Sequence, residues 1–296
     1  MYMKHSWTFN YTSHLGYSPP ELRPQFLHSA GEGDLVKHVH HAAELGMAGV
    51  LYPWAIERPR GEVEAVAAAV RERGLRSSAV IATPMEVLAS GIWTRTGASD
   101  RRRLEDCVRQ AARTAVSLGS DLLAAIVINH NDAGAPEPAR QREAALQNIR
   151  SMADIAGHEG LRLGIEPMNR LPNVLIASMR DGVDFVQEVD RADVGLVFDT
   201  GHVSQTDGDL LGALDAAYGH VQLVQIVDQP GRVEPGAGNL NLVELGAQLV
   251  RLGYSGLVDL EHGWSSPGSQ GEVDGLERIR RFDEAVHDAA LNQETD

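Results

Sequence analysis

Short hydrophobic runs alternate with amphipathic segments along almost the whole chain. The runs have the length of buried strands, whereas the segments between them are rich in helix-forming residues and carry apolar positions at helical spacing. Alternation of this kind is typical of parallel βαβ units. The sequence therefore predicts eight strands, which lie within residues 5–10, 49–54, 77–84, 122–131, 161–169, 194–202, 221–228 and 256–264.

The predicted helices support the same architecture. Amphipathic patterns cover residues 34–46, 61–74, 101–119 and 142–160, and each of these segments ends at a glycine, the residue that most often terminates a helix. Eight strand–helix units within 296 residues predict an α/β fold. The fold class that we expect is a single (β/α)8 TIM barrel over residues 1–296, in which residues 291–296 form a frayed tail.

A doubly wound open sheet is the alternative fold. Such a sheet usually carries a glycine-rich dinucleotide-binding turn after its first strand, and residues 5–20, HSWTFNYTSHLGYSPP, contain no such turn. Two long stretches rich in glycine and proline, residues 85–99 and 229–240, are predicted to be functional loops over one mouth of the barrel.

Composition narrows the classes of function. The formal net charge of −15 disfavours nucleic acid as a partner, because binding to a phosphate backbone depends on clustered lysine and arginine. The single cysteine, Cys107, excludes an intramolecular disulfide and a cysteine-rich zinc site, and it fits a reducing compartment. No apolar run is long enough to span a bilayer. These features predict a cytoplasmic protein with no membrane partner.

Oxygen-bearing side chains stand at the ends of four consecutive predicted strands. Glu166, Asp199 and Glu261 each follow an apolar run, and Gln225 and Asp228 lie on the strand between the last two. Any one of them could be a capping residue, but several carboxylates that converge without a cation would repel one another. Oxygen ligands suit Mg²⁺ or Mn²⁺, so the pattern favours a divalent metal site at the barrel mouth.

Two further choices follow from the spacing. Gln222 and Gln225 point to opposite faces of their strand, and Gln225 lies nearer the C-terminal mouth, so it is the predicted ligand. His202, three residues after Asp199, is a candidate for a weaker ligand, a proton relay or a substrate hydrogen-bonding group, unless it only satisfies local carbonyls.

Four segments of the chain resemble the hydroxypyruvate isomerase family, which belongs to the xylose-isomerase-like TIM-barrel sugar isomerases and epimerases. These segments are LGIEPMN, VGLVFDTGH, VQIVDQPGRVEPGAGNLN and GLVDLEH. The third is the most specific match, because the family shows a Q-I-x-D-x-P-G-R-x-E-P-G-x-G pattern there. The likeness covers most of the chain, but residues 1–120 match only in outline.

The resemblance implies roles for individual residues. By this similarity Glu166 and Glu261 would be the catalytic acid/base pair and, with Asp199 and Gln225, would hold one divalent metal ion, Mg²⁺ or Mn²⁺. The same similarity implies that the substrate is contacted by His202, Arg232 and Glu234.

The chain also departs from the family pattern. Val233 stands where a histidine is expected after the arginine, and Asn239 stands where a glutamate is usual, so the identity of the substrate is left open. Trp54 and Asn129 are candidate substrate-binding residues, although Trp54 could equally serve packing. Trp7 and Asn10, near the start of the chain, are further candidates for the pocket wall.

The site predicts proton transfer next to a carbonyl group. A divalent metal and two glutamates can support an enediolate, which gives isomerisation or epimerisation of a small hydroxy-carbonyl compound or sugar. A metal-dependent lyase or dehydratase acting on an oxidised sugar or cyclitol is the alternative. A DNA-repair endonuclease is opposed by the net charge, and a non-catalytic binding protein would be favoured by an absence of metal. The predicted partner is a small carbohydrate-like molecule, and a homo-oligomer is possible.

Overall fold

A parallel sheet curls through the centre of the molecule. The computed structural model describes residues 6–19, 22–169 and 173–292, and within these residues the sheet has nine strands in the order β3-β2-β1-β9-β8-β7-β6-β5-β4. The strands are β1 (Asn10–His14), β2 (Gly49–Leu51), β3 (Arg76–Ser77), β4 (Val80–Ile81), β5 (Leu122–Ala125), β6 (Arg162–Ile165), β7 (Val194–Asp199), β8 (Val221–Ile226) and β9 (Leu257–Leu260).

The two ends of this strand order close the sheet into a barrel. β3 and β4 stand at opposite ends of the order, yet they are consecutive pieces of one stretch of chain. That stretch bonds to both neighbours: the Ile81 N–H donates to the Pro53 carbonyl at 2.8 Å, and the Ala82 N–H donates to the Ala124 carbonyl at 2.8 Å. β3 and β4 together therefore form the third stave, and the predicted (β/α)8 barrel is confirmed.

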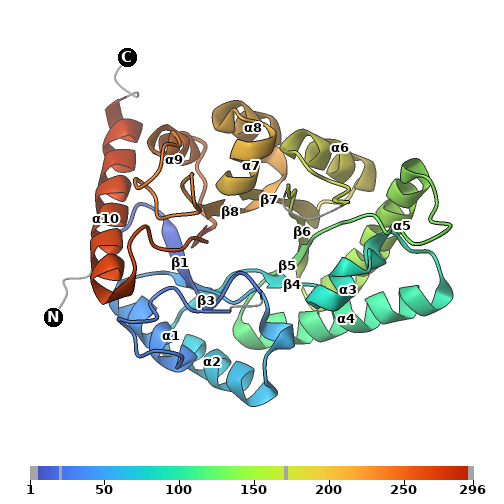
Figure 1. Cartoon of the computed structure of the whole chain (residues 1–296), viewed down its shortest axis with the longest axis horizontal. Coiled ribbons are helices and arrows are strands. Elements are labelled where there is room, and N and C mark those ends of the chain that lie inside the picture. The colour runs from blue at the N-terminus through green and yellow to red at the C-terminus, as the bar shows by residue number, and fades with distance from the viewer. Residues whose placement is uncertain (1–5, 20–21, 170–172, 293–296) are drawn as a thin grey trace.

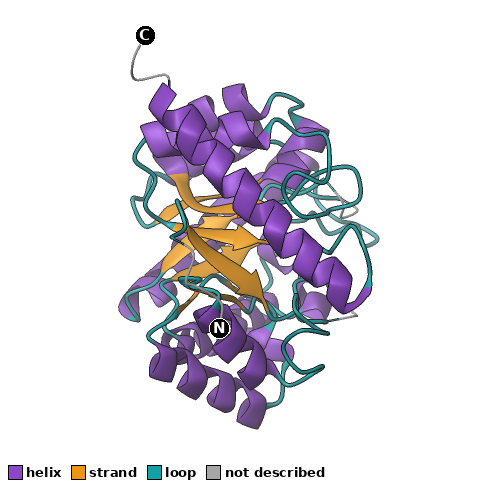
Figure 2. Cartoon of the chain, turned by 90° about the vertical axis from the view of Figure 1, so that its left-hand side faces the viewer, coloured by secondary structure: helices purple, strands orange, loops and turns teal. Residues whose placement is uncertain are grey.

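The helices form a ring around the sheet (Figure 1), and they enclose the strands on both sides in the orthogonal view (Figure 2). Gly74 and Gly119 end two of them in the left-handed conformation, with φ of 64° and 74°, as their places in the sequence predict. The helices are α1 (Leu35–Glu44), α2 (Arg60–Arg73), α3 (Met85–Ala89), α4 (Ala98–Leu118), α5 (Pro138–His158), α6 (Met179–Val189), α7 (Thr200–Thr206), α8 (Leu210–Ala217), α9 (Leu242–Arg251) and α10 (Gly268–Asn292).

Three predicted boundaries were wrong. The first strand is Asn10–His14, whereas the predicted residues 6–9 are not in a strand and residue 5 lies outside the described part of the chain. The hydrophobic pattern missed this strand because Thr12 and His14 are polar and bond to polar partners. The stretch 85–99 is not one loop, since it contains α3 and the short 3-10 helix Ile92–Thr94. α10 continues to Asn292, so residues 291 and 292 are helical, and residues 293–296 of the predicted tail lie outside the described part of the chain.

Two apolar clusters surround the strands. The larger lies between sheet and helices, and the smaller gathers residues of several strands, such as Ile81, Ala124, Val197 and Leu223, with Trp54. Interdigitated apolar burial on this scale is the main force that holds such a barrel together. Among the described residues, no helix combines the length and the apolar composition that a membrane crossing requires.

Candidate active site

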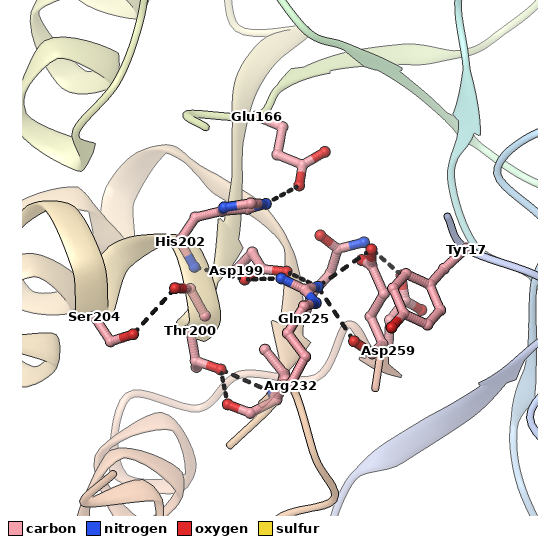
Figure 3. A network of polar contacts seen from close by, with 12 residues as sticks. Tyr17, Glu166, Asp199, Thr200, His202, Ser204, Gln225, Arg232 and Asp259 are labelled. Atoms are coloured by element: carbon pink, nitrogen blue, oxygen red, sulfur yellow. Dashed lines mark hydrogen bonds and ion pairs between the residues drawn. The ribbon is translucent and has the colours of Figure 1, made fainter. Parts of the chain in front are cut away.

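Three predicted site residues meet where β6 and β7 end. Glu166 directly follows β6, Asp199 is the last residue of β7, and His202 lies in the first turn of α7. Because neighbouring parallel strands carry their carboxyl ends to the same mouth, these side chains are brought together. All three are buried, and one potential ligand atom from each lies within 4.8 Å of the others (Figure 3).

Asp199 has two structural partners that explain why a buried strand ends on a charge. Its Oδ1 accepts the His202 backbone N–H at 2.9 Å, which caps α7. The Arg232 guanidinium also reaches it, with Nη2 2.8 Å from Oδ2 and Nη1 3.4 Å from Oδ1. Burial alone would raise the pKa of Asp199, but the charges and hydrogen bonds of Arg232 and His202 lower it below its usual value.

Glu166 is much less well satisfied. Its Oε1 lies 3.8 Å from His202 Nε2, which is too long for a hydrogen bond. Burial, helped by the nearby charges of Asp199 and Asp259 and opposed by Arg232, raises the pKa of Glu166 to about 8. A buried carboxylate of this kind gains by meeting a cation.

The His202 ring is held by a residue that the sequence analysis did not single out. His202 Nδ1 lies 2.8 Å from Asn169 Oδ1, and Asn169 Nδ2 in turn donates to Gln205 Oε1 at 2.8 Å. Since the Asn169 oxygen only accepts, Nδ1 carries a proton, so in the neutral ring the lone pair lies on Nε2, which faces Glu166. That is the arrangement found in metal-bound histidines.

Gln225 lies on β8 between two carboxylates. The strand register places it beside Asp199 of β7 on one side and Asp259 of β9 on the other. Its Nε2 donates to Asp259 Oδ2 at 3.5 Å, whereas its Oε1 is buried and has no hydrogen-bond partner among the described residues. A buried acceptor in this state is costly unless something else satisfies it.

Glu261 follows β9 and approaches the cluster from that side. Its side chain is 13% exposed, and Oε1 lies 3.3 Å from Arg232 Nη2. Burial raises the pKa of Glu261 well above its usual value, Asp199 and Glu166 raise it further, and Arg232 opposes them. Arg232 therefore stands between Asp199 and Glu261 and is paired with both.

Asp259 is a buried carboxylate that sequence reasoning missed. It is fully buried, and its oxygens accept from Thr12 Oγ1 at 2.6 Å and Ser78 Oγ at 2.7 Å. Burial raises the pKa of Asp259 to about 6, although these hydroxyl donors and Gln225 lower it. The signal that could have found it is the aspartate inside the apolar run LVDL, two residues before Glu261.

The remaining predicted substrate residues differ in their relation to this cluster. The Arg232 guanidinium lies over the Tyr17 ring, 5.5 Å from its centroid. Trp54 is buried, and its Nε1 donates to the Tyr17 carbonyl at 2.9 Å, so it supports the loop that carries this ring. The Asn129 N–H donates to the Asn173 carbonyl at 2.7 Å, and Asn129 Oδ1 is buried without a hydrogen-bond partner in the part of the chain that the structure describes.

Glu234 is engaged elsewhere. Its carboxylate accepts from the Ser265 N–H and from Ser265 Oγ, both at 2.7 Å, and it pairs with Arg278 of α10. These contacts join the β8–α9 loop to the β9–α10 loop. The two candidates near the start of the chain do not line the mouth, because Trp7 Nε1 donates to the Leu45 carbonyl and Asn10 Nδ2 donates to the Ser255 carbonyl.

The donors at the mouth fit a divalent ion. Gln225 offers an unsatisfied oxygen, His202 offers a ring nitrogen, and Glu166, Asp199 and Glu261 offer carboxylates, of which Asp199 raises the pKa of both glutamates. Carboxylate, amide and imidazole donors of this kind suit Mg²⁺ or Mn²⁺.

Comparison with known proteins identifies the family of this chain. Residues 39–282 match the family described as "Xylose isomerase-like TIM barrel". The chain belongs to this family. It is 28% identical to 2-oxo-tetronate isomerase of Pectobacterium atrosepticum, over 76% of this chain and 89% of that protein. It is 30% identical to a Streptomyces coelicolor protein named "Putative hydroxypyruvate isomerase", over 75% and 82%. The resemblance found in the sequence motifs is thus confirmed.

Solved structures share the fold. A family 2 AP endonuclease from Brucella melitensis superposes with a TM-score of 0.73 at 23% identity, over 89% of this chain and 96% of that one. D-psicose 3-epimerase from Clostridium cellulolyticum H10, solved with D-tagatose, gives a TM-score of 0.71 at 19% identity, over 96% and 99%. At these identities the likeness concerns the barrel alone.

Proposed function

We propose that this protein is an isomerase or epimerase of a small hydroxy-carbonyl compound or sugar, similar to hydroxypyruvate isomerase, and that it depends on one divalent metal ion. The relatives named above as isomerases support the reaction class. The observation that carries the metal is the cluster of Glu166, Asp199 and His202 beside the unsatisfied oxygen of Gln225. The ligands in this proposal are Glu166, Asp199, Gln225 and Glu261, with His202 beside them.

Two glutamates divide the proton transfer in this proposal. When bound, Mg²⁺ or Mn²⁺ would polarise the substrate carbonyl and stabilise the negative charge of an enediolate. Glu166 and Glu261 face the mouth from β6 and β9, which are separated by β7 and β8 in the barrel. One carboxylate removes the proton on the carbon next to the carbonyl. For isomerisation the other returns a proton to the former carbonyl carbon, while the hydroxyl proton moves to the former carbonyl oxygen. For epimerisation it returns the proton to the opposite face of the same carbon.

Arg232 contributes a fixed positive charge to the same place. Its guanidinium is buried among Asp199, Glu261 and the Tyr17 ring, so it is positioned to donate hydrogen bonds to substrate oxygens that gain negative charge. The partner that we infer is a small carbohydrate-like molecule. The cytoplasmic location, the homo-oligomer and the absence of a nucleic-acid partner stay predictions from the sequence.

Metal analysis tests the first half of the proposal. Wild type saturated with Mn²⁺ should retain about one ion per chain, and the Asp199→Ala variant should retain much less. Asp209→Ala is the matched control, because Asp209 caps α8 as Asp199 caps α7 but is exposed and lies outside the metal cluster. Equal, negligible metal in wild type and Asp199→Ala would refute the site.

Product analysis in D₂O tests the second half. An isomerase or epimerase that exchanges the proton held by its glutamate should place solvent deuterium on the product carbon. Candidate substrates are hydroxypyruvate, 2-oxo-tetronate and ketohexoses. A dehydrated product would instead favour the lyase alternative, and no turnover of any candidate by the metal-loaded protein would count against the proposed reaction.

A further inference from the structure

Asp259 occupies an unusual place on the inner side of the barrel. Asp259 is completely buried and lies two residues before Glu261. It accepts hydrogen bonds from Thr12 of β1 and from Ser78, which follows β3. Burying a carboxylate costs several kcal/mol unless hydrogen bonds or charges compensate. A barrel stave that only had to pack would place an apolar residue there.

The third contact of Asp259 points to what this carboxylate does. Gln225 is its register partner on β8, and Gln225 Nε2 donates to Asp259 Oδ2 at 3.5 Å. The other end of the same amide, Oε1, is the buried oxygen with no hydrogen-bond partner. The Gln225 amide thus has its donor end against Asp259 and its acceptor end left over.

We propose that Asp259 is a positioning residue that orients the Gln225 amide so that its oxygen, and not its nitrogen, is presented to the divalent ion. This inference rests on the proposed function, because it takes Gln225 as a metal ligand. A glutamine amide can rotate by half a turn and exchange its two ends with little change in shape, and only the oxygen end coordinates Mg²⁺ or Mn²⁺. A carboxylate accepts and does not donate, so it holds the NH₂ end and excludes the reversed amide.

Asp259 acts through Gln225 and is not itself a metal ligand in this proposal. Thr12 and Ser78 each donate to one of its two oxygens, so both oxygens are already engaged by hydroxyl groups. It is also absent from the cluster in which Glu166, Asp199 and His202 bring their ligand atoms together. Partners that orient a ligand in this way typically change metal affinity by about 10- to 100-fold when they are removed.

A single variant and a charge-conserving double variant test the proposal. Asp259→Asn keeps the shape of the side chain but can face either end of the Gln225 amide, so the Mn²⁺ dissociation constant should rise by about 10- to 100-fold. The double variant Gln225→Glu/Asp259→Asn exchanges donor and acceptor and keeps the total charge. It should bind Mn²⁺ within about threefold of wild type, because the new amide donates to the new carboxylate, whose second oxygen faces the ion. Free Mn²⁺ is counted by electron paramagnetic resonance, on full-length protein freed of metal by chelation.

Ser78→Ala is the matched control. It removes a hydrogen bond to the same Asp259 oxygen but keeps the carboxylate and its contact with Gln225, so Mn²⁺ affinity should stay within about threefold of wild type. Circular dichroism establishes that each variant is folded before the titration.

The outcomes separate this inference from the function on which it rests. Wild type that binds no Mn²⁺ refutes the metal site itself. Wild type that binds Mn²⁺ while Asp259→Asn binds equally well refutes the positioning role alone. If Asp259→Asn does not fold, the double variant decides, since it retains the donor–acceptor pair: a folded double variant that binds Mn²⁺ more than tenfold weaker than wild type overturns the proposal.

Discussion

Asp228 on one side, and Glu166 with Glu261 on the other, are acidic side chains at the carboxyl ends of the strands whose surroundings are opposite. Asp228 is buried in the β8–α9 loop and accepts four backbone N–H groups, from Gln229 at 2.8 Å, Gly236 at 3.0 Å, Gly238 at 2.9 Å and Leu240 at 3.0 Å. Backbone N–H groups of the loop therefore satisfy both oxygens of this carboxylate, which holds the Gly/Pro-rich stretch in one conformation.

Glu166 and Glu261 have no comparable solvation. Glu166 has His202 Nε2 at 3.8 Å, Glu261 has Arg232 Nη2 at 3.3 Å, and the pKa of each is raised by burial and by neighbouring carboxylates. Buried polar groups are normally satisfied, so an exception calls for an explanation by a ligand that binds there. The difference separates the carboxylates of this region: Asp228, which holds the loop, is fully hydrogen-bonded, whereas Glu166 and Glu261, the proposed acid/base pair, have few partners.

The largest expected effect is on the unsatisfied side. Glu261→Gln keeps the size of the side chain and one coordinating oxygen, but an amide cannot act as a base near neutral pH. Turnover should fall by about two to four orders of magnitude, the usual range for the loss of a general base, while the fold persists. Steady-state kinetics of the Mn²⁺-loaded enzyme measure it.

Glu244→Gln supplies the control for that variant. Glu244 lies on α9 and pairs with Arg251 at 2.9 Å, away from the cluster, so its loss should leave turnover near that of wild type. A folded Glu261→Gln enzyme that also turns over at nearly the wild-type rate would remove Glu261 from the chemistry.

The second effect is on stability and belongs to the satisfied side. Asp228→Ala leaves four buried or half-buried N–H groups without their acceptor, and the free energy of unfolding should fall by about 3 kcal/mol. Asp228→Asn keeps one acceptor oxygen and should lose less. Urea unfolding measures both, and Mn²⁺ affinity should change far less than in Asp199→Ala. A fully stable Asp228→Ala variant would show that the loop does not depend on this carboxylate.

The same distinction explains what the sequence could and could not predict. Glu166, Asp199 and Glu261 were recognisable because each directly follows an apolar run, and parallel strands carry such residues to one mouth. Asp259 was missed because it sits inside such a run, and only the barrel shows that the run's inner face meets hydroxyls and an amide. Asn169 was missed because its role depends on the distant His202 ring.

The first strand was misplaced for a related physical reason. Hydrophobicity along the chain reports mainly the face of a strand that packs under the helices. In Asn10–His14 the polar side chains of Thr12 and His14 bond to Asp259 and to the His262 carbonyl, so the true strand is more polar than the aromatic stretch before it. Closure of the barrel, by contrast, required only the number and alternation of the elements, which the pattern shows well.

Arg232 lies between the two sets, because it comes from the loop that Asp228 holds and pairs with Asp199 and Glu261. Arg232→Ala should raise KM for the substrate by about tenfold, equivalent to about 1.4 kcal/mol, because a charge-assisted hydrogen-bond donor is lost. Arg232→Lys should recover only part of it, since an ammonium lacks the planar fork of donors. Unchanged KM and kcat in Arg232→Ala would confine Arg232 to a structural role.

The smallest expected effect concerns a group whose neutral form is satisfied. His14 is buried, its Nε2 donates to the His262 carbonyl at 3.0 Å, and its Nδ1 accepts the Gly16 N–H at 3.3 Å, so both nitrogens are used by one neutral tautomer. Burial lowers the pKa of His14 to about 3.

Stability should therefore depend on pH. At a pH below 6.5, the ordinary pKa of histidine, the unfolded chain takes up a proton that the folded chain does not, so stability is lost as the pH falls from 6.5 towards 3. Between pH 6.5 and 5.5 this group alone should cost about 1 kcal/mol of the free energy of unfolding. His14→Gln should flatten the dependence over that interval. Urea unfolding at the two pH values measures the slope, and an equal slope in wild type and His14→Gln would show that His14 is not held neutral in the folded protein.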